Sequence, residues 1–165
     1  MAARDNKTAT VEALLAQGAD PNQADNHGWT PIFQAARRGN AQMVKDLLDK
    51  GAAVDIQSDM KETPLHLAAQ TGDLDTITAI ATDKSGNAVV NVNAEDAHGL
   101  RPLHYAARKG HAQAVKLLLS LGAEDAKNDQ GQTAMDLAAN NDVKDVLRQA
   151  QPHTSRGNPL KIKIF

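Results

Sequence analysis

Six histidines are the side chains of this chain that could bind a metal ion or act as a general base. A zinc site needs converging ligands, commonly two histidines one turn apart on a helix or a pair of cysteines. The sequence has no cysteine, and no two of its histidines lie three or four residues apart. It also lacks a phosphate-binding glycine loop, a Gly-x-Ser-x-Gly turn and a His-Glu-x-x-His helix. We therefore predict no catalytic residues, no cofactor and no metal site.

Acidic residues recur beside segments with the composition of tight turns, at Asp25, Asp59, Asp96 and Asp129. Carboxylates in such places accept hydrogen bonds from nearby backbone N–H groups and so organise the turn. We interpret these four residues as structural.

The composition argues against several other classes of function. The net charge is −2 and the charges are scattered, which does not favour nucleic acid or anionic lipid as a partner. No stretch approaches the roughly 18 apolar residues of a membrane span, and residues 1–6 do not resemble a signal peptide. The absence of cysteine fits a reducing compartment. We expect a monomeric cytoplasmic protein that binds neither nucleic acid nor membrane.

Two short motifs recur along the chain. The first reads Thr-Pro-Ile-Phe-Gln-Ala-Ala at 30–36, Thr-Pro-Leu-His-Leu-Ala-Ala at 63–69, Arg-Pro-Leu-His-Tyr-Ala-Ala at 101–107 and Thr-Ala-Met-Asp-Leu-Ala-Ala at 133–139. Its copies start 33, 38 and 32 residues apart. The second motif, Leu-Leu-x-x-Gly-Ala, occurs at 14–19, 47–52 and 118–123. This period predicts a repeat protein with four full units and one partial unit at the N-terminus.

Each unit is predicted to hold two short helices joined by a loop. Thr30 and Thr63 are expected to cap the first helix through their hydroxyls, with proline at its first position. Arg101 replaces this threonine, so we expect a less clean helix start there. Glycines such as Gly72 end the first helix. Apolar residues spaced i, i+3, i+4, as in 43–48, indicate the second helix.

The combined pattern Asp-x-x-Gly-x-Thr-Pro-Leu-His-x-Ala-Ala-x-x-Gly resembles the ankyrin repeat. The resemblance implies an all-α fold, an α-solenoid of stacked helix-turn-helix repeats with β-hairpin-like loops at one edge. It assigns the domain to residues 1–151, with repeats at about 2–24, 25–57, 58–94, 95–127 and 128–151. It also implies that His66 and His104 form hydrogen bonds between neighbouring repeats.

The sequence departs from this pattern in three segments. Five extra residues between 81 and 90 are expected to lengthen the loop after a second helix. The first repeat begins inside a helix, which indicates either a natural cap or a fragment of a longer protein. Residues 152–165 are not ankyrin-like, and 159–165 alternate apolar and basic side chains. We expect this tail to dock on the last repeat, or alternatively to add to a partner.

The resemblance implies a protein-protein interaction module that binds its partner on the concave surface made by the loops and first helices. Trp29 stands at a turn position, where it either anchors a partner or covers the neighbouring hairpin. Basic residues precede two of the helix-ending glycines, so we expect an acidic segment with an apolar anchor as the partner. The predicted contact residues are Asn26, His27, Trp29, Arg37, Arg38, Met60, Glu62, Gln70, His98, Leu100, Arg108 and Lys109.

Two further expectations come from the repeats. Because the first repeat is incomplete, the alternative function is a targeting segment of a larger enzyme or secreted effector whose active domain lies outside this chain. The resemblance also predicts that asparaginyl hydroxylases modify Asn93 and Asn22, with Asn93 modified first.

Overall fold

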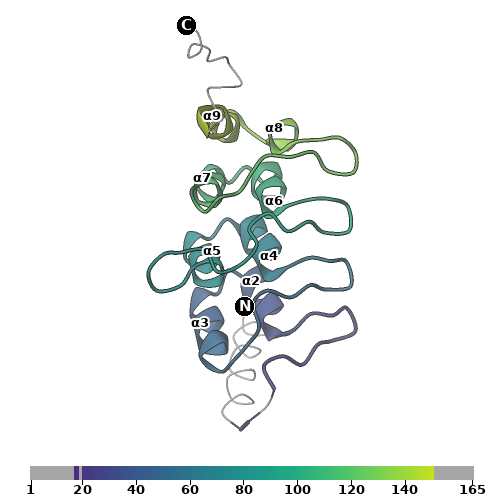
Figure 1. Ribbon diagram of the computed structural model, residues 1–165. Coiled ribbons are helices and arrows are strands. Elements are labelled where there is room, and N and C mark those ends of the chain that lie inside the picture. The colour runs from purple at the N-terminus through teal and green to yellow at the C-terminus, as the bar shows by residue number, and fades with distance from the viewer. Residues whose placement is uncertain (1–16, 19, 151–165) are drawn as a thin grey trace, which may run out of the picture.

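A computed structural model describes residues 17–18 and 20–150 and arranges them as an elongated stack of antiparallel helix pairs (Figure 1). First helices of successive repeats pack on one another, and each contacts its own second helix. This arrangement confirms the all-α solenoid. Most of the partial repeat 2–24 and the whole tail 152–165 lie outside the described residues. The helices are α2 (Pro31–Arg37), α3 (Ala41–Asp49), α4 (Pro64–Thr71), α5 (Leu74–Ala81), α6 (Pro102–Arg108), α7 (Ala112–Ser120), α8 (Ala134–Leu137) and α9 (Asn141–Ala150).

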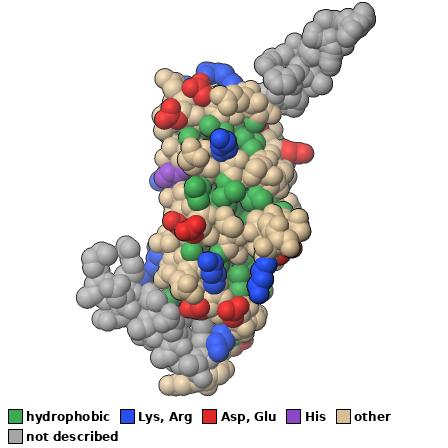
Figure 2. Space-filling view, turned by 90° about the vertical axis from the view of Figure 1, so that its left-hand side faces the viewer, with side chains coloured by type: hydrophobic (Ala, Val, Ile, Leu, Met, Phe, Trp, Pro, Cys, Tyr) green, Lys and Arg blue, Asp and Glu red, His purple; other side chains and the backbone are tan. Residues whose placement is uncertain are grey.

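The repeats align in three columns along the stack. In Figure 1 the second helices α3, α5, α7 and α9 form the left column, the first helices the middle one, and the turns project to the right. Figure 2 looks onto the left-hand side, where apolar side chains appear between charged ones. The turns and first helices therefore share one side of the molecule.

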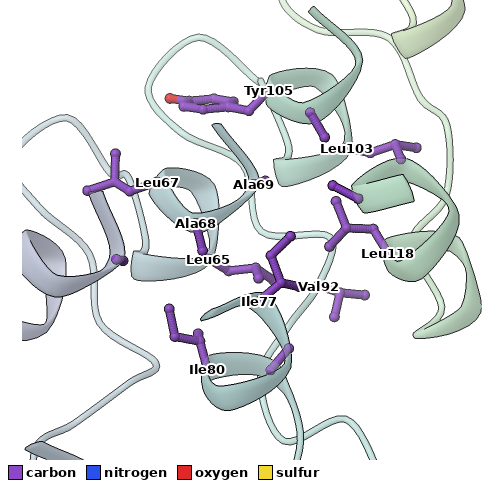
Figure 3. Close-up of a cluster of buried hydrophobic side chains, with 14 of the residues drawn as sticks. Leu65, Leu67, Ala68, Ala69, Ile77, Ile80, Val92, Leu103, Tyr105 and Leu118 are labelled. Carbon is purple, nitrogen blue, oxygen red and sulfur yellow. The ribbon is translucent and has the colours of Figure 1, made fainter. Parts of the chain in front are cut away.

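The core runs continuously between the two columns of helices. Figure 3 shows Leu65 of α4, Ile77 of α5 and Leu118 of α7 converging from two neighbouring repeats, and all three side chains are buried. The Ala-Ala pair of each first helix is fully buried in α2, α4 and α6. Small side chains let neighbouring helices approach closely, which explains why this core needs few aromatic residues.

The second helices α3, α5 and α9 begin at side-chain caps that the sequence analysis did not identify. The side chains of Asn40, Asp73 and Asn140 accept hydrogen bonds from backbone N–H groups three residues further on, at 2.9–3.0 Å. Such bonds satisfy donors that the first helical turn leaves free. Local sequence thus fixes the point where α3, α5 and α9 start.

Repeat three lacks the side-chain cap, as the replacement of threonine by Arg101 predicted, but its helix does not start later. Helix α6 begins at Pro102, directly after its cap residue, just as α4 begins at Pro64. The ring of His104 accepts a hydrogen bond from the backbone N–H of Arg101 at 2.9 Å, as the ring of His66 does from Thr63 at 3.0 Å. The Arg101 guanidinium instead lies 3.2 Å from the Glu95 carboxylate.

The expected cap at Thr30 is wrong, whereas that at Thr63 is confirmed. Thr63 Oγ1 accepts from the backbone N–H of His66 and lies 2.9 Å from His66 Nδ1. Phe33 stands where repeat two has His66 and offers no polar ring atom. Among the described residues, Thr30 Oγ1 is the buried side-chain polar atom left without a partner.

Replacing Thr30 with valine should therefore stabilise the protein. The change removes a buried hydroxyl without a hydrogen bond and keeps the side-chain shape, so we expect a gain of about 1 kcal/mol in the free energy of unfolding. Thr63→Val is the matched control and should lose about 1–2 kcal/mol, because it breaks the contacts with His66. Urea unfolding followed by circular dichroism measures both. Equal losses in the two variants would contradict this account of Thr30.

The extra residues of repeat two form an exposed loop beside α5, as the sequence predicted (Figure 1). An isolated bridge pairs Thr82 with Ala88 at its base. At its tip, Asp83 Oδ1 accepts hydrogen bonds from the backbone N–H groups of Ser85 and Asn87 at 2.9 and 3.0 Å. The loop lies on the side of the second helices, so it does not belong to the surface made by the turns.

Candidate functional site

Each projecting turn is held by one side chain at its first position. That side chain accepts hydrogen bonds from the backbone N–H groups two and four residues later, at 2.8–3.3 Å. The prediction that carboxylates organise the turns is right for Asp25 and Asp96. It is wrong for Asp59 and Asp129, because the residues before them fill this role. The four holding residues are Asp25, Ser58, Asp96 and Asn128.

Backbone hydrogen bonds join each turn to the next along the stack. Carbonyl oxygens of His27, Met60 and His98 accept from N–H groups of the following turn at 3.0, 2.9 and 3.0 Å. These bonds fix the spacing of the turn tips. They also place the side chains of His27, Met60 and His98 in one row along the edge of the molecule.

Lys61 occupies a turn position that glycine fills in the other repeats. Gly28, Gly99 and Gly131 have φ of 75–78°, and Lys61 has φ of 62°. A side chain in this left-handed conformation costs about 1 kcal/mol. Lys61 is exposed beside Met60, whose side chain is 50% exposed. The sequence analysis missed Lys61, although aligning the four turns on their first residues would have revealed it.

Trp29, Phe33 and Arg37 form an aromatic and cationic cluster on the first described helix. The Trp29 and Phe33 rings are stacked, with centroids 5.9 Å apart and planes at 9°. The Arg37 guanidinium lies 5.4 Å from the centroid of the Trp29 ring. Trp29 thus packs on helix α2 of its own repeat, with part of its surface still exposed. A partly exposed indole under a guanidinium can take up both an apolar and an anionic group.

A second cluster surrounds Tyr105 on α6. The Arg108 guanidinium lies 5.3 Å from the centroid of the Tyr105 ring, and the His66 ring packs edge-on against that ring at 4.8 Å. The Tyr105 hydroxyl donates to Asp96 at 2.6 Å. Burial raises the pKa of Tyr105, and the bond to the Asp96 carboxylate adds to this effect. Arg108 therefore lies over a neutral ring held in place by the turn of its own repeat.

The predicted contact residues divide into two groups by exposure. Side chains of Trp29, Arg38, Glu62, Gln70 and Leu100 are partly buried. Of the whole set, the structure brings Trp29 and Arg37 into direct contact and distributes the others along the turns and the ends of the first helices. The exposed members are Asn26, His27, Arg37, Met60, His98, Arg108 and Lys109.

Histidines of the repeated motif connect neighbouring repeats, as the resemblance implied. Nε2 of His66 lies 2.8 Å from the carbonyl of Leu100, and Nε2 of His104 lies 2.7 Å from the carbonyl of Ala126. Burial lowers the pKa of His66, so its ring is neutral at pH 7. Within residues 17–18 and 20–150, no three His, Asp or Glu side chains are close enough together to hold a metal ion. No helix in these ranges has the length and apolar character needed to cross a bilayer.

Asn22 and Asn93 each bridge to the Gly-Ala segment of the next repeat. The Asn22 amide donates to the carbonyl of Gly51 and accepts from the N–H of Ala53 at 3.2 and 2.7 Å. Asn93 makes the equivalent bonds to Gly122 and Glu124 at 3.1 and 2.8 Å. Asn93 also accepts from Arg101 at 3.4 Å. A hydroxylase would have to open these contacts, and the additional bond gives no support to the predicted order, Asn93 before Asn22.

Comparison with known proteins gives a consistent result over most of the chain. Residues 1–96 and 84–152 match the family described as "Ankyrin repeats (3 copies)". The human transient receptor potential cation channel subfamily A member 1 is 38% identical over 111 residues, 67% of this chain and 10% of the channel. A Danio rerio protein named as a palmitoyltransferase, ZDHHC13, is 38% identical over 83% of this chain and 21% of its own length. Alpha-latrotoxin-Lt1a of Latrodectus tredecimguttatus is 39% identical over 59% of this chain and 7% of the toxin.

Proposed function

Because the chain belongs to the ankyrin-repeat family, whose repeats are protein-interaction modules, we propose that it binds another protein through its turns and first helices. The cluster of Trp29, Phe33 and Arg37 is the observation that carries this proposal. Tryptophan and arginine are the residue types that most often anchor protein interfaces. Here both are fixed in place before any partner arrives, which reduces the entropy lost on binding.

The charges at the ends of the first helices favour an acidic segment with an apolar side chain as the partner. Arg37, Arg108 and Lys109 expose basic groups there, whereas the exposed carboxylates of Asp59 and Asp129 lie on the turns. An apolar anchor would pack on Trp29 and on exposed Met60, and acidic groups would pair with the flanking cations. We propose further that the chain acts as a monomer in the cytoplasm, without catalytic activity of its own, and binds neither nucleic acid nor membrane.

The test compares variants of the full chain as baits in a lysate of the source organism. Proteins retained by the parent but lost by Trp29→Ala are candidate partners. With a purified partner, Trp29→Ala should weaken binding by about 2 kcal/mol or more, roughly 30-fold in Kd. Arg37→Glu combined with Arg108→Glu should slow association, with an effect that shrinks as salt is added.

Matched controls lie on the second helices. Lys45 of α3 and Lys116 of α7 are exposed on the opposite side of the stack, so replacing both with glutamate should leave binding unchanged. Circular dichroism and melting should be the same in all variants. The assignment fails if the Lys45 and Lys116 changes abolish binding while the Trp29 and arginine variants bind like the parent.

A second candidate function is supported by the lengths of the relatives. This chain spans 10%, 21% and 7% of the three proteins described above. The repeats would then be the targeting segment of a larger enzyme or effector, and the same surface would bring its active domain to a partner. Sequencing the gene on both sides of this segment tests the idea. An open reading frame that starts at Met1 and stops after Phe165 would rule it out.

A further inference from the structure

An open pocket of about 530 Å³ lies between α7, α8 and α9, at the C-terminal end of the stack. Volumes of this size are typical of sites that bind ligands. Five of its eight lining residues are apolar, and the three polar ones include two carboxylates. The lining residues are Leu119, Ala123, Glu124, Asp125, Thr133, Met135, Leu147 and Ala150.

The pocket lies beside the segment between the last two turns, where the sequence differs from the earlier repeats. Four residues before the holding residue of each turn stand Pro21, Val54, Val92 and Glu124. Val92 is only 6% exposed, and Val54 packs against the core. Glu124 is exposed. It lies between the holding residues Asp96 and Asn128, which are 32 residues apart, one fewer than Asp25 and Ser58. Glu124 and Asp125 thus stand in the segment where earlier repeats place the apolar side chain that packs on the core.

The rim of the pocket carries negative charge. The Asp125 carboxylate accepts hydrogen bonds from the backbone N–H groups of Ala134 and Met135 at 2.6 and 3.3 Å, which fixes its position. The nearby guanidinium of Arg101 contacts the Glu124 backbone carbonyl at 3.3 Å and is paired with Glu95. The Glu124 side chain therefore remains available to a cation from another segment.

We propose that residues 159–165 of the same chain bind in this pocket. Fifteen residues follow Ala150, which itself lines the pocket. In an extended segment, Leu160, Ile162 and Ile164 share one face, and Lys161 and Lys163 share the other. The apolar face covers the apolar part of the pocket wall, and the long, flexible lysine side chains bend over the edge of the segment to pair with Glu124 and Asp125 at the rim. The eight residues 151–158 span up to about 28 Å, which is enough for the chain to turn back.

Binding of this segment would fill the space between α7, α8 and α9. The pocket and the tail are complementary in both polarity and charge. The proposal does not depend on the partner surface, which lies on the turns and first helices.

The absence of cysteine from the sequence allows a direct test by disulfide trapping in the full chain. The test pair is Met135→Cys with Ile162→Cys. The control pair is Gln149→Cys, exposed on α9 and outside the pocket lining, with the same Ile162→Cys. With oxidised glutathione as the oxidant, the test pair should form an intramolecular disulfide at least about ten times faster than the control. Mass spectrometry distinguishes monomer from dimer.

Charge exchange tests the orientation of the tail. Glu124→Lys should slow trapping of the test pair, and adding Lys161→Glu with Lys163→Glu should restore the rate. Equal rates for test and control pairs, a missing rescue, or disulfide-linked dimers as the main product would each overturn the proposal. Dimers would place the tail on a second copy of the chain.

Amide exchange gives a second measurement in case Met135→Cys disturbs the last repeat. Ile162→Asp with Ile164→Asp should raise exchange rates in α8 and α9 several-fold, since the tail no longer covers them. His153→Asp with Ser155→Asp adds the same charge outside the proposed contact and should leave those rates unchanged. Identical exchange in parent and both variants would overturn the proposal.

Discussion

Gly72→Ala is expected to lower the free energy of unfolding by about 3 kcal/mol or more, because left-handed strain and a steric clash add up. Gly72 ends helix α4 with φ of 77°. A Cβ atom placed there would lie 2.5–2.7 Å from the ring of His111. That ring is held by a hydrogen bond of 3.0 Å between its Nε2 and the carbonyl of Gln70. Repeats two and three would therefore have to separate locally to admit the methyl group.

Gly51→Ala is the matched control for this prediction. Gly51 has φ of 92°, and a Cβ atom there would meet nothing within 4 Å. We expect a loss of about 1–2 kcal/mol from backbone strain alone. Thermal and urea unfolding of both variants separate strain from the clash. Equal losses would show that His111 yields to the added methyl group and contributes little to the contact between repeats.

Asp96→Ala is the second change with a large expected effect. The Asp96 carboxylate accepts hydrogen bonds from the backbone N–H groups of His98 and Leu100 and from the hydroxyl of Tyr105. Asp96 and Tyr105 are both buried. Removing the carboxylate leaves three donors without this partner, so the free energy of unfolding should fall by about 3 kcal/mol at pH 7. Asp25→Ala, which removes two backbone contacts from an exposed turn, should have a clearly smaller effect.

The loss caused by Asp96→Ala should depend on pH in a defined direction. Burial opposes ionisation of Asp96, but hydrogen bonds from Tyr105, Leu100 and His98 outweigh it and lower the pKa. A carboxyl group with a lowered pKa stabilises the folded state above its unfolded pKa of about 3.9. This stabilisation is lost as the pH falls through the folded pKa. The stability difference between parent and variant should therefore be constant from pH 5 to 7, within the precision of about 0.5 kcal/mol typical of such data, and shrink below about pH 4. A difference that grows on acidification would contradict the assignment.

Contacts between residues three positions apart explain where the sequence analysis was incomplete. It applied the same capping rule to Thr30 and Thr63, but the cap depends on the residue three positions later, which is Phe33 in one repeat and His66 in the other. It expected a weak start at Arg101, yet α6 begins at Pro102 without a side-chain cap, and the His104 ring accepts from the backbone N–H of Arg101. In each case the capping rule considered the first residue alone, while the hydrogen bonds at the helix start depended on that residue together with the one three positions later.

The candidate surface was predicted in part. The register of the repeats placed Trp29, Arg37 and Arg108 on the turns and first helices, and the structure positions them there. What the sequence could not provide is which of these residues meet. Stacking of Trp29 on Phe33 and the position of Arg37 over the indole depend on side-chain packing. Lys61 was overlooked because a lysine gives no sign of positive φ unless its turn is aligned with the others.

The resemblance to the ankyrin repeat implied the inter-repeat roles of His66 and His104, and the structure confirms them. The sequence by itself determined the repeat and the helix pairs, because each repeat contacts only its neighbours in a constant register. A period of about 33 residues is sufficient to specify that arrangement. Only the tertiary structure decided which polar groups are satisfied, which turn positions are strained and where the pocket beside α9 opens. These features depend on contacts such as that between His111 and Gln70, which are 41 residues apart. At such separations the packing of the repeats decides which groups meet, and a local sequence pattern cannot predict this.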